Sequence, residues 1–196
     1  ANLNQALDLG LVDHWTHNTE EAVSAGDVVV LATPISAVIS LMPLMERALR
    51  PSAVLTDVSS VKRSVTRAAR SSLEGKFSRF VPGHPVAGSE QSGASAAKAD
   101  LFHNHWVILS PLADTDEDAV DLVTDMWAAA GARTRLMEES LHDQVLGVIS
   151  HLPHVVAYAL MPLLDTQTAR DDCMTLAAGG FYDISRIASS DPVMWR

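Results

Sequence analysis

A continuous apolar segment near the N-terminus constrains the fold of this chain more than any other feature. The run Val28-Val29-Val30-Leu31-Ala32 contains no polar residue. Three consecutive β-branched valines favour an extended strand, and the lack of polar alternation indicates burial on both faces. Such a strand belongs to a parallel sheet that is covered by helices on either side. The sequence therefore predicts an α/β architecture.

Further strands and helices alternate along the first two thirds of the chain. Short apolar runs predict strands at 53–56, 80–81 and 106–109. The segments between them have helical periodicity, and we expect helices at 36–49, 61–73 and 115–130. This alternation predicts a Rossmann-like fold with a parallel sheet, of which the chain carries only part.

The pattern changes from Glu138 onward, where helical periodicity dominates. Pro153 and Pro162 interrupt this pattern and predict a kinked helix or two joined helices. We therefore expect an α/β domain over residues 1–137 and an all-α helical domain over 138–196. One apolar helical face is formed by Leu141, Val145, Val148, Ile149 and Leu152.

Composition excludes several classes of function. The chain has 196 residues, of which 47% are hydrophobic, and a formal net charge of −10. That charge disfavours nucleic acid and anionic membranes as partners, although an anionic substrate can still bind in a locally cationic pocket. Cys173 is the only cysteine, which fits a reducing cytoplasm. No uninterrupted apolar run approaches the ~18 residues of a membrane span, and the N-terminus has no signal-peptide pattern.

Two loops follow predicted strands and precede predicted helices. They are Thr33-Pro34-Ile35 and the segment from Asp57 through Ser59 and Ser60 to Lys62. Backbone N–H groups and the positive end of a helix dipole point to such positions, which suits a dinucleotide phosphate or nicotinamide. Ordinary turns with serine caps explain the same residues about equally well.

The densest polar segment is Gly83-His84-Pro85-Val86-Ala87-Gly88-Ser89-Glu90. We interpret it as a turn that holds the His84 imidazole at a strand end, where an open α/β sheet places its chemistry. An imidazole titrates near neutral pH, so it can accept a proton from a substrate hydroxyl, while Glu90 could orient a ligand. A histidine satisfied by the backbone is the structural alternative, but the glycines favour function.

Three more histidines lie in the helical segment, namely His142, His151 and His154. The last two are three residues apart and share a helix face. We interpret the group as the polar lining of an active-site cleft, with capping or core histidines as the alternative. Their spacing matches no zinc motif, so we expect no metal.

The C-terminal segment adds an arginine and a tryptophan to the candidates. Arg186 follows Asp183 at helical spacing and could bind a carboxylate with its planar guanidinium or form a surface ion pair. Trp195 could cover a pocket, although packing is the commoner role of tryptophan.

These motifs together resemble the prephenate and arogenate dehydrogenases of tyrosine biosynthesis. Each motif alone is weak, but the set occurs in the family's order along nearly the whole chain. The resemblance rests on Asp57-Val58-Ser59-Ser60-Val61-Lys62, Gly83-His84-Pro85, Gly88-Ser89-Glu90, Leu101-Phe102, His142-Asp143, Ser150-His151-Leu152-Pro153-His154, Gly179-Gly180-Phe181, Arg186-Ile187-Ala188, Ser190-Asp191-Pro192 and Met194-Trp195.

The resemblance implies an NAD- or NADP-dependent oxidative decarboxylation of prephenate to 4-hydroxyphenylpyruvate, or of arogenate to tyrosine. It implies a cytoplasmic homodimer and possible feedback inhibition by tyrosine. It assigns catalysis to His84 and Ser60. From their position between strands and helices, we expect the loop residues Thr33, Pro34, Asp57 and Ser59 to bind the cofactor. Substrate binding is assigned to His154, Arg186, Gly179, Glu90, His151 and Trp195.

The chain also departs from the family pattern. No strand with a Gly-x-Gly-x-x-Gly turn is present, so we expect that segment before Ala1, and further dimerisation helices after Arg196. Without the residue that selects the ribose, the sequence does not distinguish NAD from NADP. Two alternatives stay open: a non-catalytic module that senses tyrosine or a related aromatic acid, and a metal-dependent hydrolase that uses the three histidines of the helical segment.

Overall fold

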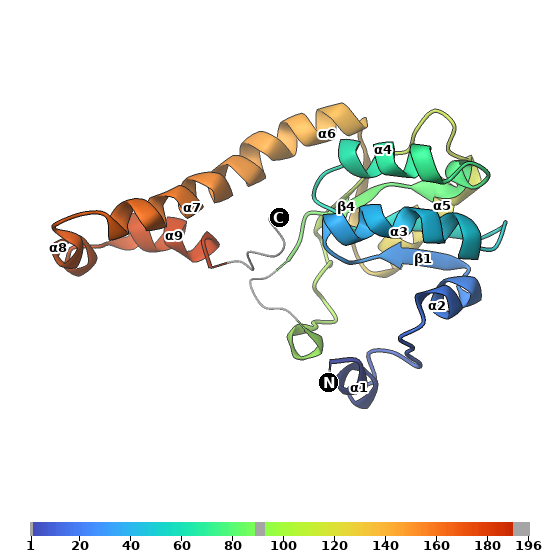
Figure 1. The fold of residues 1–196 in the computed structure, drawn as a ribbon, viewed down its shortest axis with the longest axis horizontal. Helices are drawn as coiled ribbons and strands as arrows, with labels where there is room; N and C mark the ends of the chain where they lie inside the picture. The colour runs from blue at the N-terminus through green and yellow to red at the C-terminus, as the bar shows by residue number, and fades with distance from the viewer. Residues whose placement is uncertain (1, 89–92, 190–196) are drawn as a thin grey trace. The chain divides into compact units, whose positions relative to one another are not determined.

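The computed structural model describes residues 2–88 and 93–189. The chain divides into two compact units, Ala1–Asp143 (unit 1) and Gln144–Arg196 (unit 2). Unit 1 contains two sheets with helices around them, and the described part of unit 2 is helical (Figure 1). The predicted fold class, a partial Rossmann-like α/β fold followed by helices, is confirmed.

The first sheet of unit 1 is entirely parallel. Its strands are β1 (Val28–Leu31), β2 (Val54–Asp57) and β3 (Phe80–Val81), in that order across the sheet. Leu31 pairs with Asp57 at the last position of β1 and β2, so the carboxyl ends of these strands meet at one edge. The loops predicted to bind a cofactor therefore leave the sheet side by side.

The second sheet has the order β4 (Gly83–Pro85), β5 (Trp106–Leu109) and β6 (Arg133–Leu136). The interpretation of Gly83–Pro85 as a turn was wrong, because β4 pairs antiparallel with β5 and places His84 opposite Ile108. Strand β6 was not predicted. It pairs parallel with β5, but three of its four residues are exposed, so it has no apolar pattern.

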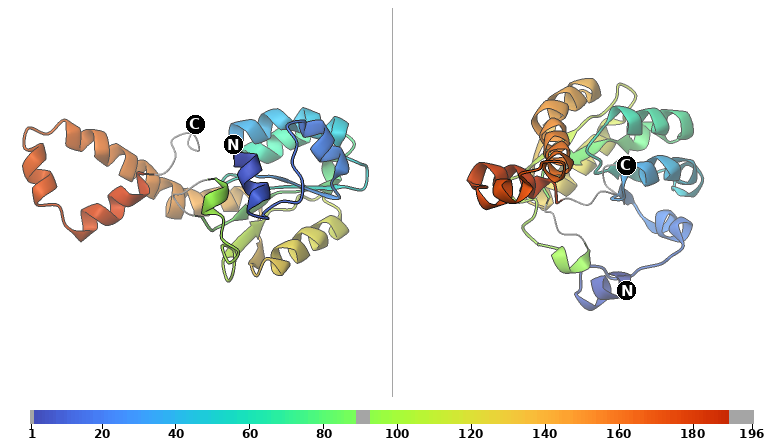
Figure 2. Two further views of the ribbon diagram at one scale, coloured as in Figure 1. Left: turned by 90° about the horizontal axis from the view of Figure 1, so that it is seen from below. Right: turned by 60° about the vertical axis from the view of Figure 1, so that its left-hand side comes forward.

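Helices cover both faces of the strands of unit 1 (Figure 2). Leu55 and Phe80 pack in one core with α2 (Thr19–Ala25), α3 (Ile35–Ala48) and α4 (Arg63–Ser72). Their neighbours Val54 and Val81 pack in a second core with α5 (Glu117–Ala129). Consecutive residues of these strands therefore face opposite cores, which is why neighbouring positions are both apolar. The shorter elements are α1 (Asn2–Asp8) and the 3₁₀ turns η1 (Phe77–Arg79) and η2 (Ala94–Ala96).

The helical segment begins with α6 (Glu139–Leu146), continues through a π-helical turn, η3 (Gly147–His151), and runs into α7 (Leu152–Asp165). Pro153 lies in the first turn of α7, where its missing N–H costs little. The irregular turn therefore precedes this proline. Two more helices, α8 (Arg170–Thr175) and α9 (Gly179–Ile187), follow and contact α7.

The segment Glu139–Asp165 is one 27-residue helix, long and apolar enough to cross a membrane by length and composition. Its most apolar window has a mean hydropathy of 1.4 and is 11% buried. The sequence has no uninterrupted apolar run of that length, because single polar residues are scattered through the helix. Core and interface helices meet the same criterion, so it assigns no membrane.

Candidate active site

The centre of the site in unit 1 is a pair of buried histidines. His84, on β4, is 9% exposed, and His142, on α6, is fully buried. Nδ1 of His84 lies 2.9 Å from Nε2 of His142, and the two rings meet edge to face with centroids 5.1 Å apart. The histidine identified from the sequence therefore has a second imidazole as a direct hydrogen-bond partner.

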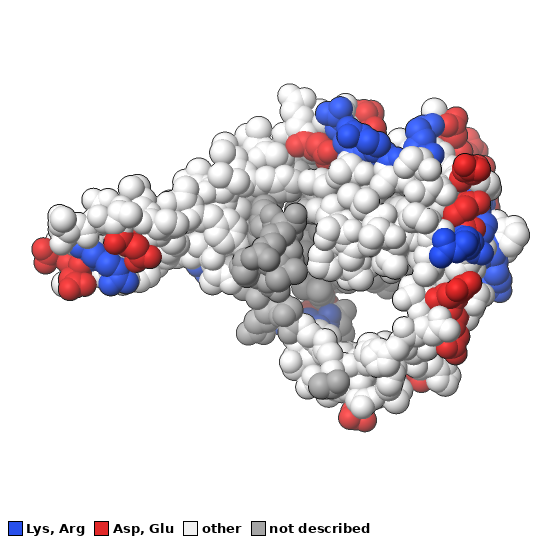
Figure 3. Space-filling view, viewed as in Figure 1, with Lys and Arg blue, Asp and Glu red and all other residues white. Residues whose placement is uncertain are grey.

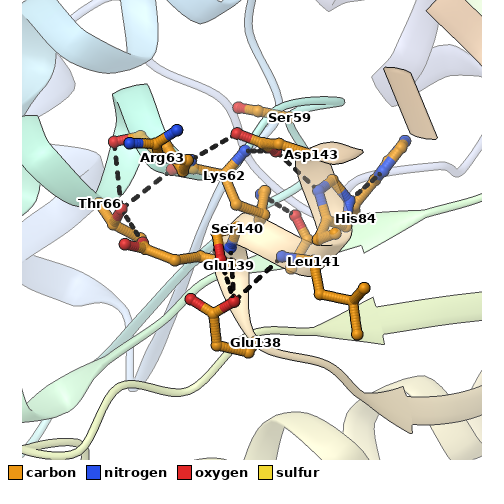
Figure 4. Close-up of polar contacts among 12 residues, drawn as sticks. Ser59, Lys62, Arg63, Thr66, His84, Glu138, Glu139, Ser140, Leu141 and Asp143 are labelled. Atoms are coloured by element: carbon orange, nitrogen blue, oxygen red, sulfur yellow. Dashed lines mark hydrogen bonds and ion pairs between the residues drawn. The ribbon is translucent and has the colours of Figure 1, made fainter. Parts of the chain in front are cut away.

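The second imidazole is in turn bound to the next residue in the chain. Nδ1 of His142 lies 2.8 Å from Oδ1 of Asp143. The same carboxylate accepts the backbone N–H groups of Lys62 at 2.7 Å and Arg63 at 3.0 Å, which begin α4. Figure 4 shows Asp143 between the start of α4 and His84. A carboxylate at the N-terminus of a helix satisfies otherwise unpaired amides.

The ionisation of Asp143 follows from these contacts. Partial burial disfavours the charged carboxylate, but hydrogen bonds from the Lys62 N–H, His142 and the Arg63 N–H outweigh it and hold the pKa of Asp143 below its usual value. Asp143 is therefore an anion at neutral pH, and it can only accept hydrogen bonds.

A buried ion pair supports the strand that carries His84. Nζ of Lys62 lies 2.7 Å from Oδ2 of Asp57, and both side chains are fully buried. The ammonium also donates to the carbonyl of Gly83, while the Gly83 N–H donates to Oδ1 of Asp57 at 3.1 Å. Burial lowers the pKa of Lys62 below its usual value, against the opposing attraction of Asp57. These bonds fix β4 against the end of β2.

Gly83 is required by this close approach rather than by a ligand. A Cβ at position 83 would lie 2.8 Å from the backbone oxygen of Asp57, a distance that real Cβ atoms do not adopt. The sequence interpretation, in which the glycines admit a ligand, misses this contact between two strands. The glycine places the next residue, His84, beside the carboxyl end of β2.

The residues predicted to bind a cofactor lie at the carboxyl edge of the first sheet. Thr33 and Pro34 are exposed between β1 and α3, and Pro34 is the N-cap of α3, which has no side-chain capping bond. Asp57 is buried, and its carboxylate binds protein groups, including the Ser59 N–H at 3.0 Å. The hydroxyl of Ser59 is buried and has no hydrogen-bond partner in the described part of the chain. Ser60 is half-buried in the same loop.

The predicted substrate residues belong to unit 2 or lie outside the described residues. His151 ends the π-helical turn, and Nδ1 of His154, on α7, donates to the Ser150 carbonyl at 2.9 Å. Gly179 begins α9, with open space where a Cβ would be, and Arg186 is exposed near the end of this helix. Glu90 and Trp195 lie outside the described residues. Residues 2–88 and 93–189 contain no group of three or more His, Cys, Asp or Glu side chains arranged to hold a metal ion.

Sequence reasoning gave no role to Lys62 or Asp143 and grouped His142 with His151 and His154 as cleft lining, whereas the structure pairs His142 with His84 and Asp143. The adjacent histidine and aspartate at the start of a helix were a usable signal. Their partners, however, are 58 and 81 positions away in the chain, so only the fold reveals them.

Two family models match consecutive parts of this chain. Residues 1–136 match the nucleotide-binding domain of prephenate dehydrogenase, and residues 138–196 match its dimerization domain. The chain belongs to the prephenate dehydrogenase family. A cyclohexadienyl dehydrogenase of Zymomonas mobilis is 38% identical over 98% of this chain and 65% of its own length. A prephenate dehydrogenase of Bacillus subtilis is 38% identical over 97% of this chain and 52% of its own length.

Solved structures of the family are similar as well. Prephenate dehydrogenase from Aquifex aeolicus, in complex with hydroxyphenyl propionate and NAD+, has a TM-score of 0.89 and 37% identity, covering 98% of this chain and 67% of that one. Synechocystis arogenate dehydrogenase has a TM-score of 0.78 and 28% identity, covering 97% and 68%. The chain thus spans between about half and two thirds of the length of these four relatives.

Proposed function

We propose that this protein catalyses the NAD(P)-dependent oxidative decarboxylation of prephenate to 4-hydroxyphenylpyruvate, or of arogenate to tyrosine, as a step of tyrosine biosynthesis. The family supports this reaction class. The observation that carries it is the almost fully buried His84 imidazole, which is bound through Nδ1 and lies beside the end of β2, where the Ser59–Ser60 loop begins. An imidazole so placed can receive the proton of a substrate hydroxyl.

The residues present fit a dinucleotide at the carboxyl edge of the first sheet. The unpartnered buried hydroxyl of Ser59 and the uncapped start of α3 after Thr33 and Pro34 offer polar groups to a ligand. The Asp57 carboxylate is occupied by Lys62 and Gly83, so we propose that it shapes this edge without touching the cofactor. A bound nicotinamide supplies the hydride acceptor. The Aquifex relative holds NAD+ in its crystal structure, which supports the same class of cofactor here.

The chemistry assigned to this chain is proton removal and substrate positioning. Hydride leaves the ring carbon that bears the hydroxyl, and His84 takes the hydroxyl proton while Ser60 positions that hydroxyl. The ring carboxylate departs as CO₂, and the electrons of the broken C–C bond complete the aromatic ring. The phenolate oxygen then regains a proton. Aromatisation favours the loss of CO₂, so the demanding tasks are alignment and deprotonation.

We assign substrate recognition to the residues of the helical domain. Arg186 binds a substrate carboxylate through its guanidinium fork, and His154 hydrogen-bonds the substrate. Gly179 and His151 are assigned to the same site, and the resemblance to the family assigns Glu90 and Trp195, which lie outside the described residues, to substrate binding as well. Tyrosine is the product formed from arogenate, and it resembles the 4-hydroxyphenylpyruvate formed from prephenate. It would therefore bind at this site as a feedback inhibitor.

We also propose that the protein is a homodimer and a soluble cytoplasmic enzyme. Residues 138–196 match a dimerization domain, and four large apolar side chains of α7 are more than half exposed within one chain, namely Leu152, Val155, Val156 and Leu163. The surface of α7 in Figure 3 carries almost no charge, whereas charged side chains gather at α8. A second copy of the chain would cover that apolar surface.

The reaction is tested with His84→Asn in the full-length protein. Asparagine preserves hydrogen bonding but cannot act as a base near neutral pH. We expect kcat to fall by about 10³-fold, at the upper part of the range for general-base catalysis, while NAD(P) affinity stays within about twofold. Turnover is measured with prephenate and with arogenate, each with NAD+ and NADP+, and cofactor affinity by calorimetry. Near-normal turnover by the variant, or no activity of the parent on either substrate, would overturn the proposal.

A further inference from the structure

The hydrogen bonds around Asp143 determine where the proton of His142 resides. Two backbone amides, of Lys62 and Arg63, donate to the Asp143 carboxylate, and Nδ1 of His142 approaches Oδ1 at 2.8 Å. A carboxylate anion has no proton to give. Nδ1 of His142 must therefore carry the proton and donate it.

The position of the proton on His142 in turn determines the position of the proton on His84. A neutral His142 with its proton on Nδ1 has a lone pair on Nε2, and that atom lies 2.9 Å from Nδ1 of His84. His84 must then donate from Nδ1, and its own lone pair is on Nε2. The opposite arrangement would turn a nitrogen lone pair of His142 toward the negatively charged Asp143, which is repulsive.

We propose that His142 and Asp143 are positioning residues that fix the tautomer of His84, so that Nε2 of His84 is the atom that accepts the substrate's hydroxyl proton. This inference rests on the proposed function. In the step itself the substrate O–H bond breaks, an Nε2–H bond forms, and no further proton needs to move. The imidazolium of His84 then donates more strongly to His142, whose bond to Asp143 stabilises the positive charge.

The charge balance around the pair supports this role for Asp143. The loop between β2 and α4 contributes Lys62, whose ammonium binds the carbonyl of Gly83 next to His84. A cation so close would disfavour a protonated imidazole, but Asp57 neutralises it in a fully buried pair. Asp143 is a further carboxylate, bound directly to the histidine pair, so it favours the protonated state of His84.

The protonation pattern can be tested without catalysis. Long-range ¹H–¹⁵N spectra of the imidazoles in the full-length protein, recorded above the histidine pKa, distinguish the two tautomers. We expect His84 and His142 both to carry the proton on Nδ1, and His84→Asn to identify the His84 signals. A proton on Nε2 of His84 would overturn the inference.

The kinetic test uses His142→Leu and His142→Gln. Leucine removes the acceptor for the Nδ1–H of His84, so kcat should fall by about 10²-fold and the acid limb of the pH profile of kcat/KM should move to lower pH. KM should change by less than about threefold. Glutamine offers an amide oxygen to the same N–H, so His142→Gln should retain more kcat than His142→Leu.

Asp143→Asn and a matched control complete the experiment. Removing the anion should also lower kcat and move the acid limb to lower pH. Ser140→Ala, on the same helix but bonded to Glu138, should leave both unchanged. An unshifted pH profile with an unchanged kcat in His142→Leu, when His84→Asn is inactive, would overturn this inference and leave the proposed function standing. If His84→Asn keeps its activity, the proposed function itself fails.

Discussion

The two units of this chain satisfy their apolar and polar groups in different ways. Unit 1 has two buried cores, one on each side of its sheets, and a fully buried ion pair. Among residues 144–189 of unit 2, the only buried hydrophobic side chains are those of Leu146 and Ala157. Large apolar residues elsewhere in unit 2 are mostly exposed, and Leu176 reaches 80%.

This difference separates a unit that buries its apolar side chains in its own cores from a unit that leaves most of its large apolar side chains exposed. Burial of apolar area supplies about 25 cal/mol per Å², and unit 2 has few buried side chains to contribute it. Its exposed side chains follow helical spacing along α7, which makes a continuous apolar surface. The match to a dimerization domain gives the simplest reason for that surface. We therefore expect substitutions in unit 2 to affect association, and substitutions in unit 1 to affect folding.

The largest expected effect is that of Val155→Glu. Val155 lies on α7 and is 58% exposed within one chain. A twofold dimer would bury two unpaired carboxylates, so we expect the dimer dissociation constant to rise by about 10⁴-fold, or about 5.5 kcal/mol. Glutamate favours helix more than valine does, so α7 itself is not weakened. Sedimentation equilibrium of the full-length protein measures the change.

Leu122→Glu is the matched control for unit 1. Leu122 is an apolar residue of α5 that is 42% exposed, and we expect its substitution to leave the dimer intact. If Leu122→Glu dissociates the protein and Val155→Glu does not, the assignment of association to unit 2 is wrong.

The contrast also explains how much of the fold could be read from the sequence. Most strands and helices of unit 1 follow from apolar runs and helical periodicity, but the expected burial of Val28–Leu31 on both faces was wrong. Only Leu31 of β1 is buried, and Val30 is 41% exposed. Strand β6, Arg133–Leu136, has no such run, since its side chains are mostly exposed and only its backbone pairs with β5. Strand β4 has only three residues, one of which is a proline. Its partner β5 lies more than 20 positions away in the chain, so nothing local indicates the pairing.

The sequence also revealed some residues of the candidate site and missed others. Local sequence singled out His84, because two glycines and a proline lie close to it in the chain. Lys62 was given no role because lysine is seldom buried, and nothing nearby in the sequence indicates its pairing with the Gly83 carbonyl. The hydrogen bond between His84 and His142 joins two elements that only the folded chain brings together.

The second prediction concerns the buried ion pair of unit 1. Lys62→Met keeps an unbranched apolar stem but removes the ammonium, which leaves the Asp57 carboxylate buried without its cation. Loss of one partner of such a pair costs about 3–5 kcal/mol, which should appear in the free energy of unfolding of the full-length protein, measured in urea.

Arg70→Met provides the comparison at the surface. Arg70 pairs with Asp114 at 3.3 Å, but both side chains are more than half exposed, so we expect a change below about 1 kcal/mol. Equal losses in the two variants would show that burial does not decide the importance of these ion pairs.

The third prediction compares one glycine from each unit. Gly83→Ala places a Cβ 2.8 Å from the Asp57 backbone oxygen, and neither strand can move without breaking the bonds around Asp57. We expect a loss of about 1–3 kcal/mol in unfolding free energy. Gly147→Ala, in the π-helical turn, meets no atom within 4 Å, and alanine favours helix over glycine, so its stability should be equal or slightly higher. If Gly147→Ala also lowers the unfolding free energy, unit 2 is packed more tightly around this turn than the exposure of its side chains indicates.

The smallest expected effect comes from Asp118, an exposed carboxylate of unit 1 that is paired with the mostly buried Arg79. Arg79 binds both carboxylate oxygens of Asp118, at 2.8 and 2.7 Å, and holds the pKa of Asp118 below its usual value. A carboxyl group whose pKa is lower in the folded state stabilises that state above its unfolded pKa, and this contribution disappears as the pH falls through the folded pKa. Arg79→Gln should therefore raise the pKa of Asp118 toward its ordinary value, as followed by NMR titration of the carboxyl carbon. Because the Asp118 side chain is 73% exposed, removing its charge with Asp118→Asn should hardly change the unfolding midpoint at neutral pH, which would confine the large effects in unit 1 to its interior.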